Sequence, residues 1–525
     1  MAIWQSGYAL LPGLTAGSSR LTVFAAFSAI LVIYYLATII RNVWFHPLSK
    51  FPGPRIAAFS RLPYLRKQLK GRFVHWTKEV HDRYGSDVVR LAPDALCFIG
   101  DSAWNDMLAY RPGHPKFEKD SIIYGKPAAG ANSLLTANEA DHTRMRRLLA
   151  HAFSEKALKA QEPIIQSYIS TLIMRLQEQY EAGGKADMVT WYRWWAFDLI
   201  GDLTFGQSFD NLKAQQNHPW VSVLSDYVKG VVFLSVVRRF WMSDTLLKIF
   251  LPKKLMLKRL QHLREISETV DRRINMETER PDFISYILKQ NDEKGMSLAE
   301  IKANTSVFMG AGSEATATVL CGATYYLAKN PNTLAKVTRE VRAAFDKSDQ
   351  ITLQSTLGLG YLDAVIMEAN RMYPPGLAGQ PVISPPEGAM VSGYWIPGGT
   401  NVQISQWAAF QSASNFFQPQ SFIPERWLGE DPRFAADRKE AFQPFSVGNK
   451  NCIGKNLAQG ALRLILANLF WHFDFELSDE TKRDWPNQDA FLRWQKTPLV
   501  IQLKPRQEQA MNGGARGGHE KTRDA

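Results

Sequence analysis

The feature that most constrains this chain of 525 residues is an uncharged, continuously apolar run near its beginning. The run reads LTVFAAFSAILVIYYLATII and extends from Leu21 to Ile40. As an α-helix it would cover about 30 Å, which matches the hydrocarbon core of a bilayer. Because the run is apolar on all sides, longer than the core of a signal peptide and without an obvious cleavage site, it predicts a transmembrane anchor over residues 21–40 rather than a buried helix or a removed signal.

Charge is distributed unequally around this run. Arg20 is the only basic side chain before it, whereas basic residues are frequent after it: Arg41, Lys50, Arg55, Arg61, Arg66, Lys67, Lys70 and Arg72. The positive-inside rule therefore makes residues 1–20 a short lumenal N-terminus and places the larger part of the chain in the cytosol. The prolines of HPLSKFPGP predict that residues 41–55 form a stiff, basic, proline-rich hinge.

The rest of the chain reads as one domain. Hydrophobic residues make up 45% and charged residues 21%, which is a globular composition. Residues 56–506 contain no repeat or long linker, and helical patterns dominate, with strand-like pieces near Val88–Ile99 and Met390–Ile404. The predicted fold class is mainly α with minor β, and the polar, glycine-rich residues 507–525 are predicted to form a disordered tail.

Composition argues against several classes of function. The three cysteines, Cys97, Cys321 and Cys452, are far apart, so neither a disulfide framework nor a paired-cysteine zinc site is supported, and a reducing compartment is expected. The net charge is +12, but the basic residues are spread along the chain without a recognition motif, which argues against a nucleic-acid partner. Membrane lipid with an anionic surface, or an acidic protein partner, fits this charge better.

The residues with the clearest chemistry lie in the segment FSVGNKNCIG, residues 445–454. An apolar stretch typical of a buried helix follows directly, so Cys452 is predicted at a helix N-terminus. There the helix dipole and free N–H groups favour a thiolate and lower the pKa of the thiol. Gly448 and Gly454 allow a tight turn around it. The alternative is a structural buried cysteine.

This segment resembles the cysteine loop of the cytochrome P450 family, F-x-x-G-x-[RH]-x-C-x-G, at Phe445, Gly448, Cys452 and the final glycine. The resemblance implies that Cys452 is the axial thiolate ligand of a haem b iron, within a single large haem-binding domain over residues 56–506. Lys450 stands where the family usually has arginine or histidine. It keeps the positive charge for a haem propionate but lacks the planar fork.

A second motif lies at Glu368 and Arg371, which the i, i+3 spacing places on one helical face. The surrounding stretch LDAVIMEANRMYPP is apolar and ends at two prolines, which predicts a buried, partnered pair. The pair resembles the E-x-x-R motif of the same family. That resemblance implies that Arg426 completes the motif, with a structural role beneath the cysteine loop.

A third motif lies in a long helix predicted over Ser297–Lys329, which opens with a capping box. In its middle, Gly310, Ala311 and Gly312 would let a flat macrocycle or bound oxygen approach. The sequence around these residues, MGAGSEATAT, resembles the oxygen-activation motif of the family, [AG]-G-x-[DE]-T. The resemblance implies that this helix lies against the haem.

The acid of that motif is Glu314, but Ala315 replaces the threonine, and a hydroxyl appears only at Thr316. One residue rotates a helical side chain by about 100°, so Thr316 supplies the missing alcohol only if the helix is locally bulged. Glu314 with ordered water, or a hydroxyl of the substrate, is the other expected source of protons. Glu314 and Thr316 are therefore the candidate catalytic residues.

His142 and Arg146 are spaced i, i+4, which places them on one helical face. By themselves they would form a solvated basic face. The resemblance implies instead that they hold haem propionates, as a W-x-x-x-R or H-x-x-x-R pattern does in the family. Val382, after Gln380 and Pro381, stands where relatives commonly carry an arginine for a propionate, and valine cannot take that role.

The resemblance covers nearly the whole chain and implies a monooxygenase that uses O₂ and electrons from NADPH. A cytochrome P450 reductase is the expected partner, because the chain has no apparent nicotinamide or flavin motif. Arg144, Arg147 and Lys455 are candidates for its basic docking face, although solvated surface charges would look the same. Wording such as SFIPERWL resembles fungal members that tailor secondary metabolites. We therefore expect a single-pass protein of the endoplasmic reticulum membrane, with its catalytic domain in the cytosol and an apolar small molecule as substrate.

Two other functions are compatible with the sequence. The alanine at position 315 also suits a haem-thiolate isomerase, dehydratase or peroxygenase that turns over without a reductase. A haem-binding membrane protein without catalytic activity is the third possibility. It predicts haem uptake without a spin shift on addition of substrate.

Overall fold

The computed structural model describes residues 15–109, 113, 116–124, 130–240, 243, 245, 253–276, 278–292, 295–379 and 381–506. Most of the predicted lumenal segment, the predicted tail and Gln380 lie outside the described residues. The fold is mostly helical, at 59% helix, with small sheets. This confirms the predicted fold class of mainly α with minor β.

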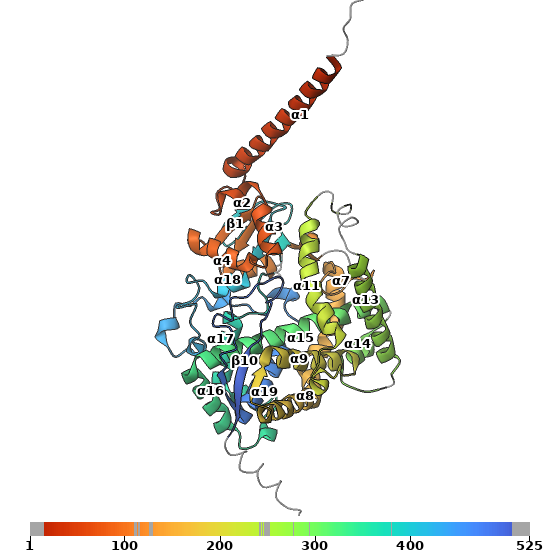
Figure 1. Cartoon of the computed structure of the whole chain (residues 1–525), viewed down its shortest axis with the longest axis vertical. Helices are drawn as coiled ribbons and strands as arrows, with labels where there is room; N and C mark the ends of the chain where they lie inside the picture. Colours follow the sequence, from red (N-terminus) through yellow and green to blue (C-terminus); the bar gives the residue numbers. More distant parts are fainter. Residues whose placement is uncertain are drawn as a thin grey trace, which may run out of the picture.

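One helix stands apart from the others. Helix α1 (Thr15–Ile40) continues as a π-helical turn, η1 (Arg41–Phe45), and projects from one end of the domain (Figure 1). Over Thr22–Phe45 the mean hydropathy is 2.4 and 0% of the apolar window is buried, so this helix is long and apolar enough to cross a membrane. The helix ends at His46, which adopts an extended conformation before Pro47.

The other α-helices form the body of the domain. They are α2 (Arg55–Phe59), α3 (Leu62–Leu69), α4 (Phe73–Tyr84), α5 (Ser102–Leu108), α6 (Ser121–Tyr124), α7 (Glu139–Leu149), α8 (Glu155–Glu181), α9 (Met188–Phe205), α10 (Asn211–Ala214), α11 (Pro219–Val237), α13 (Lys253–Ile274), α14 (Phe283–Gln290), α15 (Leu298–Lys329), α16 (Pro331–Ala344), α17 (Gly360–Met372), α18 (Gln406–Phe410) and α19 (Lys455–His472). Short 3₁₀ turns are η2 (Ala150–Phe153), η3 (Ser348–Gln350), η4 (Ser355–Gly358), η5 (Pro424–Trp427), η6 (Pro432–Phe434), η7 (Lys439–Ala441) and η8 (Gly448–Lys450).

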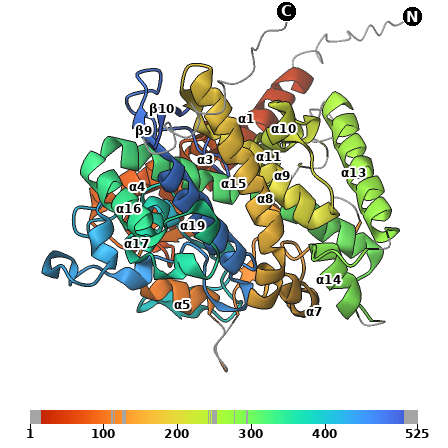
Figure 2. The ribbon, with the colours of Figure 1, turned by 90° about the horizontal axis from the view of Figure 1, so that it is seen from below.

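Helix α15 is the long helix predicted from the capping box. Ser297 is its N-cap, and the side chains and backbones of Ser297 and Glu300 bond reciprocally as predicted. Figure 2 shows α15 and α19 in the middle of the domain, with α16 and α17 on one side and α8, α9 and α13 on the other. The apolar side chains of α15 join the main core with those of α9, α17 and α19. Helix α15 is therefore the element around which the body packs.

The strands are short and lie at the edges of the helical body. They are β1 (Val88–Ala92), β2 (Ala95–Phe98), β3 (Glu118–Lys119), β4 (Lys185–Asp187), β5 (Val382–Ile383), β6 (Ala389–Val391), β7 (Tyr394–Ile396), β8 (Asn401–Ile404), β9 (Phe473–Leu477) and β10 (Val500–Pro505). One sheet has the order β1-β2-β8-β5-β3, in which only β2 and β8 pair in parallel. The strands β4-β10-β9 and the hairpin β6-β7 form two further sheets. Strands therefore occur in both stretches where the sequence predicted them.

Glu368 on α17 is fully buried and is shared by two buried arginines. Arg371 donates to its two carboxylate oxygens at 2.9 and 2.8 Å, and Nε of Arg426 donates at 3.2 Å. The indole N–H of Trp427 and the backbone N–H of Ile423 also donate to Glu368, each at 2.9 Å. Burial by itself raises the pKa of Glu368, but the two guanidinium groups lower it overall, so the carboxylate stays ionised.

The same arginines hold a segment that has little regular secondary structure. The carbonyl oxygens that Arg371 reaches, at 2.8, 2.6 and 3.0 Å, are those of Phe410, Pro419 and Ser421. Arg426 donates to the carbonyl of Phe417 at 3.1 Å and to the carboxylate of Asp437 at 2.6 Å. Buried backbone oxygens without a strand or helix partner are thereby satisfied. The E-x-x-R pair and Arg426 thus lie together in the core. They hold the segment that precedes the cysteine loop in the chain.

We predict that Glu368→Gln costs about 3–5 kcal/mol of unfolding free energy, because it leaves two buried guanidinium groups with one carboxylate fewer. The matched control is Glu178→Gln, which breaks the exposed pair of Arg175 and Glu178 at the same i, i+3 spacing and is expected to cost less than about 1 kcal/mol. Urea unfolding of the full chain in detergent, followed by tryptophan fluorescence, measures both. Equal losses in the two variants would contradict the assignment.

Candidate functional site

The segment 445–454 forms a closed loop in front of α19. The backbone N–H of Cys452 donates to the carbonyl of Phe445 at 2.8 Å, which brings the two ends of the loop together. Gly448 has φ +76°, and a Cβ there would lie 2.2 Å from the carbonyl oxygen of Leu108, so no other residue fits. Gly454 has a negative φ and open space around it. The turn therefore depends on the first glycine and not on the second.

The thiol of Cys452 is accessible, unlike those of the two other cysteines. Enclosure of the side chain by the surrounding protein nevertheless raises the pKa of Cys452, while the N–H of Gly454 and the charge of Arg146 act in the opposite direction. Helix α19 begins only at Lys455, so its dipole does not dominate. The prediction of a lowered pKa is therefore wrong for the free thiol. A bound metal cation deprotonates a coordinating thiol regardless.

Helix α7 clamps this loop from the other side. Arg146 donates from one Nη to the carbonyl of Asn451 at 2.7 Å and from the other to its side-chain oxygen. Glu139, the first residue of α7, accepts from Asn449 at 2.7 Å and pairs with Lys450 at 2.8 Å. Each of the three residues before Cys452 is thus tied to α7. The helix that carries His142 and Arg146 therefore also fixes the position of the cysteine.

His142 lies in a concentration of positive charge. It is buried, and its Nδ1 has no hydrogen-bond partner in the described part of the chain. Burial, together with the charges of Lys119, Lys450 and Arg146, lowers the pKa of His142 to about 4. Three cations and a histidine thus face a single carboxylate, that of Glu139. Such a set is suited to an anion with more than one carboxylate.

Lys119 belongs to this set, and sequence reasoning missed it. It lies on β3, directly opposite Val382 on β5, where the sequence lacks the expected arginine. Its ammonium donates to the carbonyls of Leu134 and Leu135 at 3.1 and 2.8 Å. Burial and the nearby charge of Lys450 lower the pKa of Lys119 to about 8. No local sequence signal could reveal it, because its proximity to Val382 arises from pairing of two strands that are distant in the chain.

The middle of α15 is open on one side although the helix crosses the core. Ala311 is exposed, and its helix neighbours Gly310 and Ala315 are only half-buried. A Cβ on Gly312 would lie 2.9 Å from Cδ1 of Ile200 on α9. This corrects the reason given for Gly312: its missing side chain accommodates α9 rather than a macrocycle. Because Gly310 has no side chain and Ala311 only a methyl group, no bulky side chain covers this open face.

Glu314 is not a free acid. Its carboxylate is hydrogen-bonded to the buried ammonium of Lys496 and lies 3.6 Å from Arg493. Burial raises the pKa of Glu314, but Lys496, Arg493 and the more distant Arg193 lower it overall, so the group is ionised. Its partners come from the segment before β10, which the sequence did not associate with α15.

Thr316 does not take the place of the missing threonine. Helix α15 is α-helical from Leu298 to Lys329 without a bulge, and the hydroxyl of Thr316 is turned to the carbonyl of Gly312 at 3.4 Å. A regular helix keeps Thr316 about 100° away from the direction of Ala315. The condition on which Thr316 was proposed is therefore not met.

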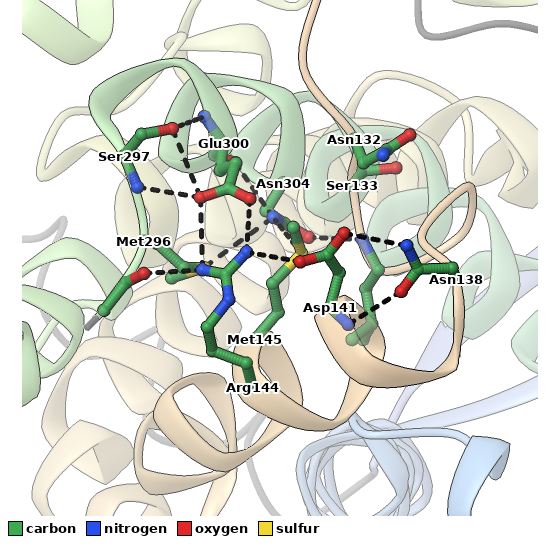
Figure 3. A network of polar contacts seen from close by, with 12 residues as sticks. Asn132, Ser133, Asn138, Asp141, Arg144, Met145, Met296, Ser297, Glu300 and Asn304 are labelled. Atoms are coloured by element: carbon green, nitrogen blue, oxygen red, sulfur yellow. Dashed lines mark hydrogen bonds and ion pairs between the residues drawn. The ribbon is translucent and has the colours of Figure 1, made fainter.

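Arg144 is a partly exposed residue that is paired within the protein. Figure 3 shows its guanidinium between Glu300 and Asp141, at 2.6 and 2.9 Å, and it also donates to the carbonyl of Gly295 at 2.5 Å. These pairs raise the pKa of Arg144 further. In the same network Asn304 accepts from the backbone N–H of Leu134 at 2.8 Å. Arg144 therefore joins α7 to the start of α15, and its charge is balanced by two carboxylates.

Comparison with known proteins agrees with this geometry. The model of the cytochrome P450 family matches residues 53–502. Cytochrome P450 monooxygenase lcsI of Purpureocillium lilacinum is 43% identical over 484 residues, which cover 91% of this chain and 93% of the relative. Cytochrome P450 monooxygenase astJ of Aspergillus oryzae is 41% identical over 479 residues, covering 90% and 95%. Averantin hydroxylase of Dothistroma septosporum is 40% identical over 491 residues, covering 93% and 92%.

The family match, over a mainly helical domain with an accessible cysteine in a loop held by α7, makes the chain a haem-thiolate oxidoreductase. The chain belongs to the cytochrome P450 family and is a monooxygenase of that family. Members of the family carry a haem iron bound by a cysteine thiolate. The residues present fit that group, since Cys452 offers an accessible sulfur and the cations near the unpaired Nδ1 of His142 match two propionates.

We predict that Gly448→Ala prevents haem incorporation and lowers the thermal unfolding midpoint by several degrees, because the added methyl meets the carbonyl of Leu108 at a strained φ. Gly454→Ala is the matched control in the same loop, since the nearest atom is a ring carbon of Phe153 at 4.0 Å. The ratio of Soret to protein absorbance and a melting curve measure both effects. A normal haem content in Gly448→Ala would contradict the role of this glycine.

Proposed function

We propose that this chain is a membrane-anchored haem-thiolate monooxygenase that oxidises an apolar small molecule with O₂ and electrons from NADPH. The observation that carries the proposal is the accessible Cys452. The three residues that precede it in the loop are all bonded to α7. When bound there, haem b supplies reductive activation of O₂ and transfer of one oxygen atom to the substrate. The side chains of this protein would bind the haem, orient it and neutralise its charges.

Cys452 is the residue proposed to bind the haem iron through its sulfur. The N–H of Gly454 acts to lower the pKa of its thiol, so the same N–H supports the thiolate. The carbonyl of Phe445 accepts a hydrogen bond from the backbone N–H of Cys452, which fixes the backbone from which the sulfur projects. Gly448 provides the left-handed turn that this loop needs. Together they hold the sulfur in one orientation, as a second layer of contacts does in metal sites generally.

The propionates of the haem are proposed to bind to the basic cluster of His142, Arg146, Lys450 and Lys119. The pKa values of His142 and Lys119 lie below their usual ranges because both are buried among cations, and bound carboxylates would relieve this repulsion. Arg146 and Lys450 already hold the cysteine loop, so they would join the propionates to the residues around the ligand.

The substrate is proposed to be an apolar intermediate of secondary-metabolite biosynthesis. The open face of α15 at Gly310, Ala311 and Ala315 carries no charge, and the nearby Glu314 is paired with Lys496. An apolar ligand would therefore meet no unpaired charge on this face of the helix. The similarity to a fungal averantin hydroxylase supports a small organic substrate of this kind.

Proton delivery is proposed to use ordered water at Glu314 or a hydroxyl of the substrate. Ala315 has no hydroxyl, and the hydroxyl of Thr316 is turned to the carbonyl of Gly312. Glu314 is ionised and held by Lys496, so it is suited to orient water as an acceptor. Glu314 is therefore proposed to orient water and not to donate a proton itself.

The anchor and the reductase belong to the same proposal. Helix α1 is proposed to span the endoplasmic reticulum membrane once, with the domain in the cytosol, because the basic residues follow the apolar run. A cytochrome P450 reductase is proposed to dock near the cysteine loop, where Arg147 and Lys455 are exposed.

The second candidate is a haem-thiolate isomerase, dehydratase or peroxygenase. The observation that favours it is the combination of Ala315 with an unbulged α15, which leaves the helix without the usual alcohol. Such an enzyme would form product without NADPH and reductase.

We predict that the full chain, reconstituted with reductase in phosphatidylcholine vesicles, is reduced by NADPH and then gives a strongly red-shifted Soret band with carbon monoxide. Cys452→Ser is expected to lose this band, because an alcohol is a weaker ligand than a thiolate. Cys321→Ala removes a buried cysteine of α15 and is expected to keep it. Absence of the band in well-folded, haem-loaded protein would contradict the proposal, and product formation without reductase would favour the second candidate.

We predict that Lys119→Met speeds haem loss several-fold, because one of the cations proposed for the propionates is removed while the stem of the side chain is kept. Transfer of haem to an excess of apomyoglobin measures the rate. Lys159→Met, at an exposed position of α8, is the matched control and is expected to leave the rate unchanged. Adding Val382→Arg to the Lys119→Met variant is expected to restore retention, since the two residues face each other across β3 and β5. An unchanged rate in Lys119→Met would exclude the role.

A further inference from the structure

The segment 478–499, between β9 and β10, reaches the open face of α15. Glu314 comes one helical turn after Ala311, so the two side chains share that face. The carboxylate of Glu314 is bonded to the ammonium of Lys496 and lies 3.6 Å from the guanidinium of Arg493. Both cations belong to this segment. The positive charge at the end of the open face is therefore supplied by a part of the chain that is distant in sequence.

The position of Arg493 is fixed by its neighbours in the chain. Its carbonyl accepts the backbone N–H of Phe491 at 3.1 Å in a tight turn. The next residue, Trp494, is buried, and its indole N–H donates to the carbonyl of Pro374 at 3.0 Å. The indole ring also stacks on the ring of Tyr373, with 4.9 Å between the centroids. Arg493 therefore projects from a rigid backbone, which lowers the entropic cost of binding a ligand.

Positive charge is concentrated around Glu314. Burial raises the pKa of Glu314, but the charges of Lys496, Arg493 and the more distant Arg193 of α9 lower it overall. Burial lowers the pKa of Arg493 and Glu314 raises it again, while the charge of Arg193 adds to the lowering. Three cations thus lie near one carboxylate, so a further anion would be favourable here.

The two cations of the segment differ in their access to a ligand. The side chain of Lys496 is only 2% exposed, so its ammonium is enclosed with the carboxylate that it neutralises. The side chains of Arg493 and Glu314 are each 18% exposed. The planar fork of a guanidinium carries several N–H donors, so Arg493 can keep its contact with Glu314 and bind a second acceptor.

We propose that Arg493 is a specificity-determining residue that binds an acidic group of the substrate, so the preferred substrate is an apolar molecule with one carboxylate. The apolar body would lie along the uncharged face at Gly310, Ala311 and Ala315, and the carboxylate would be held by Arg493 at the end of that face. This inference rests on the proposed function and names the chemical class of its substrate.

Charge distinguishes a carboxylate from a neutral polar group at this position. A hydroxyl or a ketone could accept a hydrogen bond from Arg493, but it would leave the surrounding positive charge as it is. A carboxylate offsets that charge and forms stronger, charge-assisted hydrogen bonds with a guanidinium. An apolar body on the same molecule adds the burial of apolar surface, which a small inorganic anion lacks. The site therefore suits an acid that belongs to the substrate.

The test uses the full, haem-loaded chain in detergent and two series of probes. One series consists of linear carboxylic acids, from hexanoic to dodecanoic acid, that carry an imidazole ring at the far end. The other series consists of the corresponding alcohols. Imidazole binds the haem iron and shifts the Soret band, so the dissociation constant of each probe is measured without turnover. The variants are Arg493→Gln and Arg493→Lys, and the matched control is Arg483→Gln, an exposed arginine of the same segment.

In the unsubstituted chain we expect the acid of the best-fitting length to bind about tenfold more tightly than its alcohol, because a charge-assisted hydrogen bond replaces a neutral one. Arg493→Gln is expected to remove this preference and to leave the affinity for the alcohol unchanged. Arg493→Lys is expected to keep part of the preference, since it keeps the charge. Arg483→Gln is expected to keep all of it.

Three outcomes would contradict the inference. If acids and alcohols of every length shift the Soret band with equal affinity, the acid site is absent while the haem site of the proposed function stands. If Arg493→Gln weakens both series equally, Arg493 shapes the site and does not recognise charge. If no probe shifts the Soret band of the haem-loaded chain, the open face does not give access to the iron, and the proposed function fails together with the acid site.

Discussion

A buried carboxylate that must stay ionised is the constraint on which the rest of this structure depends. Glu368 has no access to water, so its charge is stable only while Arg371 and Arg426 face it. The same two arginines carry the hydrogen bonds of a backbone that has little helix or strand of its own between α18 and the cysteine loop. Glu368 therefore determines the path of the chain that presents Cys452.

The charged groups on the other side of Cys452 are mostly of one sign and do not balance one another. Helix α7 and β3 bring Lys119, His142 and Arg146 close to Lys450, and among the described residues Glu139 is the carboxylate whose charge acts on His142. Burial, together with the neighbouring cations, lowers the pKa values of His142 and Lys119, so the cluster is unfavourable until an anion joins it. The core network is satisfied within the protein, whereas this cluster is arranged for a ligand.

Helix α15 is held by charged side chains at two points along its length. At its start it is tied to α7 through Arg144 and Glu300, and in its middle Glu314 is held by Lys496. At the end of the domain that carries α1, Arg90 of β1 is hydrogen-bonded to the carbonyls of Asn42 and Pro52. Charged side chains thus join η1 to β1, α7 to α15, and α15 to the segment before β10.

The sequence by itself determined the features whose members lie within one helical turn or one loop: the apolar helix, the capping box of α15, the loop around Cys452 and the pair Glu368 and Arg371. Backbone geometry dictates their spacing, so they could be predicted. Only the tertiary structure decided the partners of Glu314 and Arg144, the packing of Gly312 on Ile200 and the position of Lys119 opposite Val382. Those contacts join residues far apart in the chain, and their geometry is set by how helices pack and strands pair rather than by local spacing.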